Sequence, residues 1–561
     1  MSKKIGVYIC ECGPNIRDRI NIDEILENLS SIEDIKVVKK YPLLCSNEGK
    51  KFLADEIKNE ELTHLVIAAC SPKEHEITFM NVCEKAGLNP YLFQLVNIRE
   101  QCAWIISNKE EATRMATKYI RAGINRVLLH KPLQKKELEC NPNVLIIGGG
   151  IAGIEASLSL ASPERKVYLV EKTSVLGGKV RKLSGLLPHQ GMDLTFLQKK
   201  IKEVENNENI VVLTSSEVEN VRGFFGNFEI VIKSNRNDLE QKEIKVGAII
   251  VATGFSLFDP KETPQYGYGT IENVVNALEF EEMIASDKIL LKNGKPPKTV
   301  ALIHCVGRKE KGYCSKVCCL YSLKFAQFLK DKLSDVNVFE FYSDLCLPHK
   351  SDQDYFEEVK KKGVNFIKAN EIQIKKSNSN INIEYKTITE KKGSLSVDMV
   401  VLSPAIIPAE NTEKLAKILN IPLDETGFFK EIHEKLDPVS TPIEGIYIAG
   451  CASGPKNILE SVIQSQAACG KILSCLIPGK KLEPEVRVSE IVEEFCTGCQ
   501  TCLSVCFYSA ISFDEFKGVS VVNEAICRGC GNCVGSCPSG AIRLKHFTYP
   551  QLYREVLEAL R

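Results

Sequence analysis

The chain has 561 residues, of which 44% are hydrophobic and 23 are cysteines, and its 72 Lys and Arg residues balance its 72 Asp and Glu residues. This length exceeds what one core supports, and a balanced charge excludes an overall field that would draw the chain to nucleic acid or an anionic membrane. The chain shows neither the apolar core of a signal peptide nor an apolar run of roughly 18 residues, so we expect a cytoplasmic protein whose cysteines bind metal or do redox chemistry.

Three strand-like runs near the N-terminus each end in cysteine: "KIGVYIC", "IKVVKKYPLLC" and "LTHLVIAAC". The helical patterns between them predict a parallel α/β domain over residues 1–138. Loops that follow parallel strands converge on one edge of the sheet, so we expect Cys10, Cys12, Cys45 and Cys70 to lie near one another. Two interpretations remain open, an iron–sulfur cluster or a redox-silent docking domain with neighbouring thiols.

The segment "NVLIIGGGIAGIEASLSLA" begins a nucleotide-binding unit that we expect over residues 139–297. A β-branched strand leads into Gly148-x-Gly150-x-x-Gly153, a helical pattern follows, and Glu171 ends the next strand "KVYLVE". The helix N-terminus would bind a pyrophosphate and the acid a ribose hydroxyl. Strand, fingerprint, helix and acid in this order predict a bound dinucleotide.

Three later segments resemble those of thioredoxin-reductase-like flavoproteins: "EKTSVLGGKV" at 171–180, "AIIVATGF" at 248–255 and "GIYIAGCASGPKNILESVIQSQAA" at 445–468. The resemblance spans about residues 140–480 and implies that the dinucleotide is FAD, held by residues 139–297 together with 409–485. In one departure, Cys451 follows Gly450 where the family usually has an Asp that binds the ribityl chain. The residues assigned to FAD are Gly148, Gly150, Ile151, Ala152, Gly153, Glu171, Lys172, Gly178, Lys179, Ala252, Thr253, Gly254, Gly450, Cys451, Asn457, Ile458 and Gln464.

A second Rossmann-like unit, expected over residues 298–408, carries cysteines where a phosphate-binding turn would lie. Its first strand leads into "HCVGRKEKGYCSKVCC" at 304–319, which lacks the third glycine of the fingerprint and has no C-x-x-C. The loop therefore suits neither a pyrophosphate nor a dithiol relay. We expect Cys305, Cys314, Cys318 and Cys319 to bind a third [4Fe–4S] cluster; the alternative is that these cysteines are buried or incidental.

The C-terminal segment, residues 486–561, holds the strongest motif. "CTGCQTCLSVC" at 496–506 and "CRGCGNCVGSCP" at 527–538 repeat C-x2-C-x2-C-x3-C. In this pattern three thiolates of one run and the fourth of the other bind each [4Fe–4S] cluster, and zinc sites lack such paired runs. The segment resembles a bacterial two-cluster ferredoxin. The expected ligand sets are Cys496, Cys499, Cys502 and Cys537 for one cluster, and Cys527, Cys530, Cys533 and Cys506 for the other.

The ferredoxin segment, FAD unit and cysteine loop together resemble the HdrA family of heterodisulfide reductases, as do "VYICECG" at 7–13 and "AACSPKEHEITF" at 68–79. The resemblance implies a mixed α/β fold and an electron-transfer component that works with other subunits of the complex and with ferredoxin or another redox protein. Electron bifurcation at the flavin is a further expectation. Many relatives carry an additional ferredoxin insertion, whereas residues 180–250 contain no cysteine here.

The resemblance also places Lys324 near the flavin ring, five residues after Cys319; the alternative is a solvated helix lysine. A different class of function, a self-contained NAD(P)H-dependent reductase, remains open. The motifs for FAD and iron–sulfur clusters favour a converter between electron pairs and single electrons.

Overall fold

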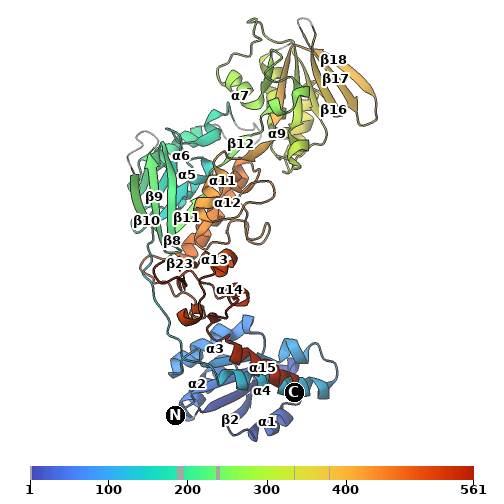
Figure 1. The fold of residues 1–561 in the computed structure, drawn as a ribbon. Helices are drawn as coiled ribbons and strands as arrows, with labels where there is room; N and C mark the ends of the chain where they lie inside the picture. The colour runs from blue at the N-terminus through green and yellow to red at the C-terminus, as the bar shows by residue number, and fades with distance from the viewer. Residues whose placement is uncertain (1–2, 186–194, 235–240, 334, 378–379) are drawn as a thin grey trace. The chain divides into compact units, whose positions relative to one another are not determined.

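The computed structural model describes the chain apart from residues 1–2, 186–194, 235–240, 334 and 378–379 (Figure 1). The chain forms two compact units. One consists of Met1–Leu138 with Glu483–Arg561, and the other is Glu139–Leu482. The expected α/β class is confirmed: parallel sheets with helices make up most of both units.

The N-terminal domain is a four-stranded parallel sheet in the order β2-β1-β3-β4. The two central strands are buried along their whole length, as expected of apolar strands covered on both faces. Helices begin at side-chain caps such as Ser46 and Asn108, whose oxygens accept from backbone N–H groups three residues on. The elements are β1 (Ile5–Cys10), α1 (Ile22–Ser30), β2 (Ile35–Tyr41), α2 (Asn47–Asn59), β3 (His64–Ala69), α3 (Pro72–Ala86), β4 (Phe93–Asn97) and α4 (Lys109–Val127).

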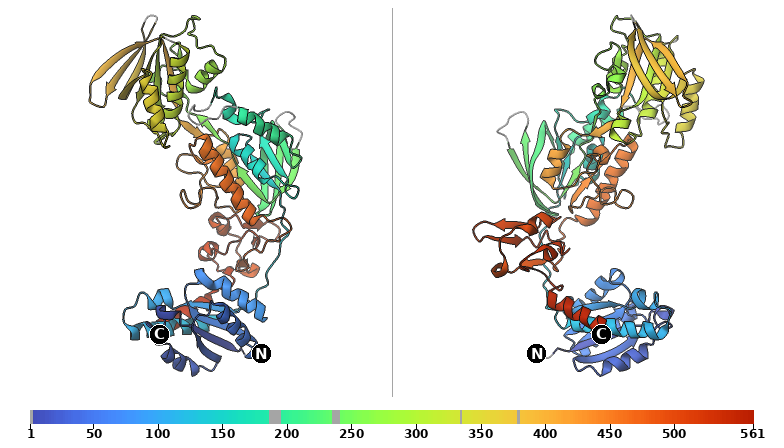
Figure 2. Two further views of the ribbon diagram at one scale, coloured as in Figure 1. Left: turned by 180° about the vertical axis from the view of Figure 1, so that it is seen from behind. Right: turned by 45° about the vertical axis from the view of Figure 1, so that its right-hand side comes forward.

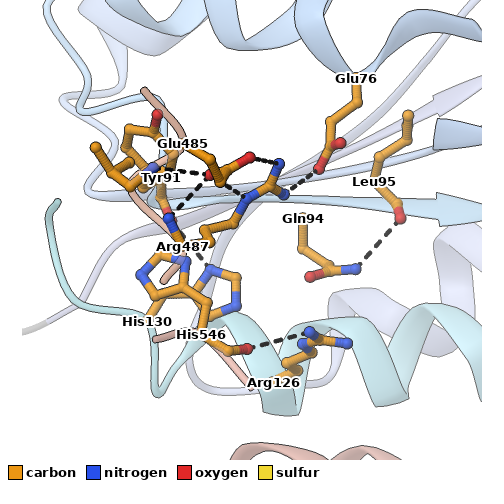
Figure 3. Close-up of polar contacts among 10 residues, drawn as sticks. Glu76, Tyr91, Gln94, Leu95, Arg126, His130, Glu485, Arg487 and His546 are labelled. Carbon is orange, nitrogen blue, oxygen red and sulfur yellow. Dashed lines mark hydrogen bonds and ion pairs between the residues drawn. The ribbon is translucent and has the colours of Figure 1, made fainter. Parts of the chain in front are cut away.

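The end of the chain packs on this N-terminal domain. The last helix, α15 (Tyr549–Leu560), lies against α4, as the red helix beside the blue domain shows in Figure 2. Figure 3 shows Arg487 between Glu485 and Glu76, at 3.2 and 2.9 Å, and the stacked rings of His130 and His546, whose centroids are 4.3 Å apart. Ion pairs and ring stacking thus join the two ends of the chain into one unit.

In the second unit, the nucleotide-binding sheet is parallel with the order β21-β11-β5-β6-β7. The helix after β5 packs against α12, where Ser465 Oγ donates to the Ala152 carbonyl at 2.7 Å. An antiparallel sheet, β8 to β10, completes this part. The elements are β5 (Val144–Ile147), α5 (Ile151–Leu160), β6 (Val167–Glu171), α6 (Thr195–Glu205), β7 (Ile210–Thr214), β8 (Ser216–Phe224), β9 (Asn227–Ser234), β10 (Gln241–Val246), β11 (Ala248–Val251), α11 (Thr412–Leu419), β21 (Ile446–Ile448) and α12 (Ile458–Cys475).

The inserted part is a seven-stranded sheet in the order β13-β19-β14-β15-β16-β17-β18. It includes β13, which pairs in parallel with β19, so this part begins before the expected boundary at residue 298. A strand of three residues has too short a pattern to be recognised without its partner. The elements are β12 (Phe255–Leu257), β13 (Val274–Asn276), α7 (Ala277–Ala285), β14 (Thr299–Val306), α8 (Arg308–Lys311), α9 (Cys318–Lys332), β15 (Asn337–Tyr342), α10 (Asp352–Lys361), β16 (Asn365–Ser377), β17 (Asn380–Thr387), β18 (Lys392–Val397), β19 (Met399–Pro404) and β20 (Ile406–Pro408).

The cysteine repeats near the C-terminus fold into a small module with very little apolar core. Its buried cluster is Cys502, Ile511, Cys533 and Ile542, so half of its members are cysteines. Its elements are β22 (Ser489–Ile491), α13 (Thr501–Val505), β23 (Ile511–Asp514), β24 (Val519–Val522), α14 (Asn532–Ser536) and β25 (Ile542–Leu544). Across the described part of the chain, no helix combines the length and apolar character needed to span a membrane.

Candidate functional site

A cavity of about 680 Å³ lies beyond the carboxyl ends of β5, β6, β11 and β21. Gly148 has φ = 113°, and a Cβ there would come within 2.3 Å of the Ala252 carbonyl oxygen. A Cβ on Gly153 would lie 1.9 Å from the Gly148 oxygen, so the turn closes only with glycine at both positions. Gly150, which begins α5, has open space where its Cβ would point. The turn therefore leaves room for a phosphate group at a helix N-terminus.

Glu171 holds this end of the cavity in shape. Its Oε2 accepts from the Gly149 N–H at 2.7 Å, and its Oε1 accepts from the N–H and hydroxyl of Thr173, both at 2.8 Å. The carboxylate is buried at the end of β6, next to the turn, where the fingerprint places a ribose-binding acid.

Most residues predicted to bind FAD line this cavity. Two predicted residues do not, and both support the walls instead: Gly153 packs under the turn, and the Gln464 amide donates to Pro438 O at 2.9 Å and Ser453 Oγ at 3.1 Å. The predicted residues that line the cavity are Gly148, Gly150, Ile151, Ala152, Glu171, Lys172, Gly178, Lys179, Ala252, Thr253, Gly254, Gly450, Cys451, Asn457 and Ile458.

The lining is positively charged, with six Lys or Arg side chains against three Glu. Burial lowers the pKa of Lys179, whose ammonium lies 5.3 Å from the centre of the Phe255 ring. Lys456 also lines the cavity; it lies within the segment 445–468 that resembles flavoproteins, but it was not among the residues predicted to bind FAD. An elongated, basic, glycine-lined cavity fits an anionic dinucleotide such as FAD.

Lys324 does not line the cavity. Its ammonium forms an ion pair with Glu281 and donates to the Gly185 carbonyl at 3.0 Å, while the Ser184 N–H donates to the same Glu281 at 2.8 Å. The lysine side chain is 11% exposed, so the alternative of a solvated lysine is wrong. Burial lowers its pKa, and Glu281 opposes that shift. The segment that Lys324 and Glu281 hold follows directly after the cavity-lining residues 178–182.

The cysteine loop lies at the carboxyl end of β14, and α9 begins at Cys318. Cys305 has φ = 61°, a left-handed conformation that is unfavourable for a cysteine and that typically marks a functional constraint. At Gly307, φ is 86° and a Cβ would overlap the Phe258 ring at 2.5 Å. The turn is therefore tight without being the glycine-rich turn of a dinucleotide site.

A buried charge pair lies behind this loop, and no motif in the sequence pointed to it. His304 Nε2 and Glu340 Oε2 are 3.0 Å apart, and both side chains have no exposed surface. Burial lowers the pKa of His304, but Cys319 and Glu340 outweigh burial and raise it to about 10. Hydrogen bonds from Cys318 and His304 hold the pKa of Cys319 below its usual range. Cys319 thus favours the thiolate, which is the form that binds metal, whereas hydrogen bonds with Cys305 and Cys319 raise the pKa of the neighbouring Cys318.

A fifth cysteine, Cys346, also reaches this loop, from the segment after β15. Its N–H donates to Cys319 Sγ at 3.4 Å, and burial and the nearby Cys314 raise its pKa. Three residues further along, His349 Nε2 lies 3.3 Å from the side-chain nitrogen of Asn457, a cavity-lining residue. The segment that contacts the cysteine loop therefore also contacts the wall of the cavity.

The cysteines of the C-terminal module gather around two small cavities, as the spacing predicts. Each cavity is lined by three cysteines of one run and the last cysteine of the other. Within the described residues, no group of three or more His, Cys, Asp or Glu side chains is placed to hold a single metal ion. A [4Fe–4S] cube is larger and takes one thiolate per iron. The first cavity is lined by Cys496, Cys499, Cys502 and Cys537, and the second by Cys506, Cys527, Cys530 and Cys533.

In the N-terminal domain, the cysteines lie where the three sheet strands end. Cys10 is the last residue of β1, Cys45 follows β2 and Cys70 directly follows β3, and these strands are neighbours. Cys12 has φ = 46°, and Arg99 Nη1 donates to its sulfur at 3.5 Å. Burial raises the pKa of Cys70 to about 11. The fold thus collects these thiols on one sheet edge beside a guanidinium group.

Two family models match the chain. One, described as pyridine nucleotide-disulphide oxidoreductase, matches residues 142–468, and the other, described as 4Fe-4S dicluster domain, matches residues 495–541. They imply FAD in the first segment and two [4Fe–4S] clusters in the second, as the sequence motifs predict.

Similar curated proteins carry the name heterodisulfide reductase. One HdrA iron-sulfur protein of the CoB–CoM heterodisulfide reductase of Methanopyrus kandleri is 34% identical over 612 residues, which cover 92% of this chain and 91% of the relative. The corresponding HdrA protein of Methanocaldococcus jannaschii is 33% identical and covers 92% of both chains. The HdrA protein of the ferredoxin/F420H2-dependent CoB–CoM heterodisulfide reductase of Methanosarcina acetivorans is 33% identical over 92% of this chain and 76% of the relative.

Proposed function

The chain belongs to the HdrA family of heterodisulfide reductases, and we propose that it passes electrons between FAD and iron–sulfur clusters within a heterodisulfide-reductase-like complex. It is an oxidoreductase with a flavin domain and a dicluster ferredoxin domain. The names of four relatives include ferredoxin, and we infer a ferredoxin-type redox protein as the exchange partner of this chain. Disulfide chemistry then takes place on other subunits.

Bound FAD would supply the conversion between two-electron and one-electron transfer. The chain's own residues would bind it: the turn at Gly148 and Gly150 would hold the pyrophosphate, and Glu171 the ribose. The segment 449–461 would surround the flavin end of the cavity. Lys324, paired with Glu281, would hold a cation at Gly185, in the segment that directly follows the cavity-lining residues 178–182.

The observation that carries the proposal is that the segment 346–349 contacts both the cysteine loop and the wall of the cavity. His349 contacts Asn457 at 3.3 Å, and the backbone of Cys346 contacts Cys319 at 3.4 Å. A third cluster on Cys305, Cys314, Cys318 and Cys319 would then lie next to the cavity and provide a route for single electrons. In this role the loop replaces the nicotinamide site of the ancestral fold.

We also propose a fourth cluster on Cys10, Cys12, Cys45 and Cys70. The strained backbone of Cys12 and the position of all four thiols on one sheet edge support it. Splitting of electron pairs between ferredoxin and a higher-potential acceptor is the finer proposal. It rests on the presence of both the flavin and the loop cluster.

Iron, sulfide and flavin analysis of anaerobically purified protein tests the cluster count. With four irons in each cube, three clusters give about 12 irons per chain and four give about 16, with one FAD. A value near eight would leave only the ferredoxin clusters.

The alternative function is a self-contained NAD(P)H-dependent reductase, which the pyridine nucleotide family model favours. Mixing the purified protein with NADPH or with reduced ferredoxin separates the two functions. We expect rapid bleaching of the flavin absorbance with reduced ferredoxin and slow bleaching with NADPH, because the cysteine loop has no third glycine. Rapid bleaching with NADPH alone would support the alternative.

A further inference from the structure

Lys456 places an ammonium group in the wall of the cavity without a carboxylate partner. Its Nζ donates to Ser453 Oγ at 3.0 Å and to the Gly454 carbonyl at 3.4 Å, and it forms no ion pair with any residue that the structure describes. Burial lowers its pKa, so the protein already makes the charged form costly. In the open cavity, water can still solvate this ammonium. A ligand that fills the cavity removes that water and leaves the charge in need of a partner.

Several other lysines in and around the site already have a carboxylate or an aromatic ring as partner. Lys324 is paired with Glu281, and Lys172 lies 3.9 Å from Glu410. The Lys179 ammonium lies over the Phe255 ring at 5.3 Å. Among these lysines, Lys456 is the one whose partners are a hydroxyl and a carbonyl. Its partner is therefore expected to come from the ligand.

Cys451 explains how this imbalance arises. The flavoproteins that segment 445–468 resembles usually have an Asp at this position, whereas the Cys451 thiol is buried and donates to the Lys456 carbonyl at 3.3 Å. Burial raises the pKa of this thiol, so it stays neutral. The exchange removes one negative charge from the cavity wall next to Lys456. The 18-residue helix α12, capped by Asn457, begins at Ile458, two residues after Lys456, and both Asn457 and Ile458 line the same cavity.

We propose that Lys456 is a positioning residue that stabilises negative charge on the pyrimidine side of bound flavin, and that Cys451 keeps this lysine free for that purpose. The proposal rests on FAD occupying the cavity. Reduction of a flavin, or addition of a nucleophile at its N5, places negative charge on the N1–C2=O region. A cation held there favours the charged form and raises the potential of the flavin.

Sulfite binding tests the proposal without any electron-transfer partner. Sulfite adds to N5 through its sulfur lone pair, a new N5–S bond forms, and the displaced electron pair comes to rest on N1–C2=O, so the dissociation constant reports stabilisation of that charge. Titrations are followed by the loss of flavin absorbance in wild type, Lys456→Met and Lys456→Arg. We expect Lys456→Met to weaken sulfite binding roughly tenfold or more, as for a lost charge-assisted contact, and Lys456→Arg to restore most of it.

Cys451→Asp provides a second, independent variant. The new carboxylate would pair with Lys456 and should also weaken sulfite binding. Lys435→Met, which removes an exposed lysine on a neighbouring loop, serves as the control and should bind sulfite as wild type does.

Lys456→Met with a full complement of FAD and a sulfite dissociation constant within about twofold of wild type would overturn the proposal. If Lys456→Met does not retain FAD, Cys451→Asp decides, and unchanged sulfite binding in that variant overturns the proposal. Wild-type protein purified without FAD would instead contradict the flavin assignment of the cavity.

Discussion

Two of the cysteine-rich regions of this protein, the C-terminal module and the loop at Cys305–Cys319, are built in opposite ways. In the C-terminal module, the cysteines of the two runs gather around two small cavities, and two of the four residues in the fully buried cluster, Cys502 and Cys533, are themselves cysteines. In the inserted domain, the cysteine loop sits on a seven-stranded sheet with its own core, next to the buried pair of His304 and Glu340. A group of cysteines can therefore form much of the buried core of its own module, or lie on a sheet whose apolar core is built without it.

The largest expected effect is on the C-terminal module. Replacing Cys502 and Cys533 by Ser removes a ligand from each cluster and two of the four residues of the fully buried cluster, so about eight irons and the ordered structure of the module should be lost. Iron analysis and limited proteolysis measure this. Residues 139–482 should keep FAD and resist the protease. A protease-resistant module without iron would show that the module folds without its clusters, contrary to this prediction. Cys475→Ser, at an exposed cysteine, is the control.

The same type of change in the loop should act only locally. Cys318→Ser together with Cys319→Ser should remove about four irons and leave FAD and the fold intact, because the sheet beneath the loop has its own core. Iron, flavin and circular dichroism measurements check this against the same Cys475→Ser control. Loss of all flavin would mean that the loop is a structural part of the cavity.

A smaller effect is expected from removing the buried pair of His304 and Glu340, which lies next to the cysteine loop. Glu340→Gln leaves the buried His304 without its carboxylate, and we expect the free energy of unfolding to fall by about 3–5 kcal/mol. Denaturant unfolding followed by flavin fluorescence measures the change. Glu357→Gln, which removes a surface ion pair with Lys360, should cost less than about 1 kcal/mol. Equal effects of the two substitutions would contradict the assigned role of the buried pair.

The smallest expected effect concerns the stacked rings of His130 and His546, which join the N-terminal domain to the segment that follows the C-terminal module. Burial, and then the facing His546, lower the pKa of His130 to about 3. The folded state therefore favours the neutral form of His130. Its contribution to the free energy of unfolding is complete above about pH 6.5, the pKa of His in the unfolded chain, and is lost as the pH falls toward about 3, the pKa in the folded chain. At pH 5 we expect a loss of about 2 kcal/mol, which His130→Gln should abolish. The fluorescence of Trp104, the chain's single tryptophan, reports this unit. Identical pH profiles of wild type and variant would refute the role of His130.

Local patterns predicted the parts of the protein in which neighbours in sequence are neighbours in space. The turn at Gly148 follows from spacing within one strand–turn–helix unit, and in each ferredoxin ligand set three of the four cysteines come from a single run. There the covalent chain itself limits the distance between the groups, so the residue types and their intervals are sufficient.

Tertiary structure alone decided the contacts between distant segments. Cys346 reaches Cys319 across 27 residues, Glu281 reaches Lys324 across 43, and β13 joins its sheet through a partner strand more than 100 residues away. Lys456 became notable only when the fold placed it in the cavity wall without a carboxylate. Such pairings depend on the order of strands in the sheet and on which side chains are removed from water together. Neither the strand order nor the shared burial of two distant side chains is encoded in the local spacing of residues.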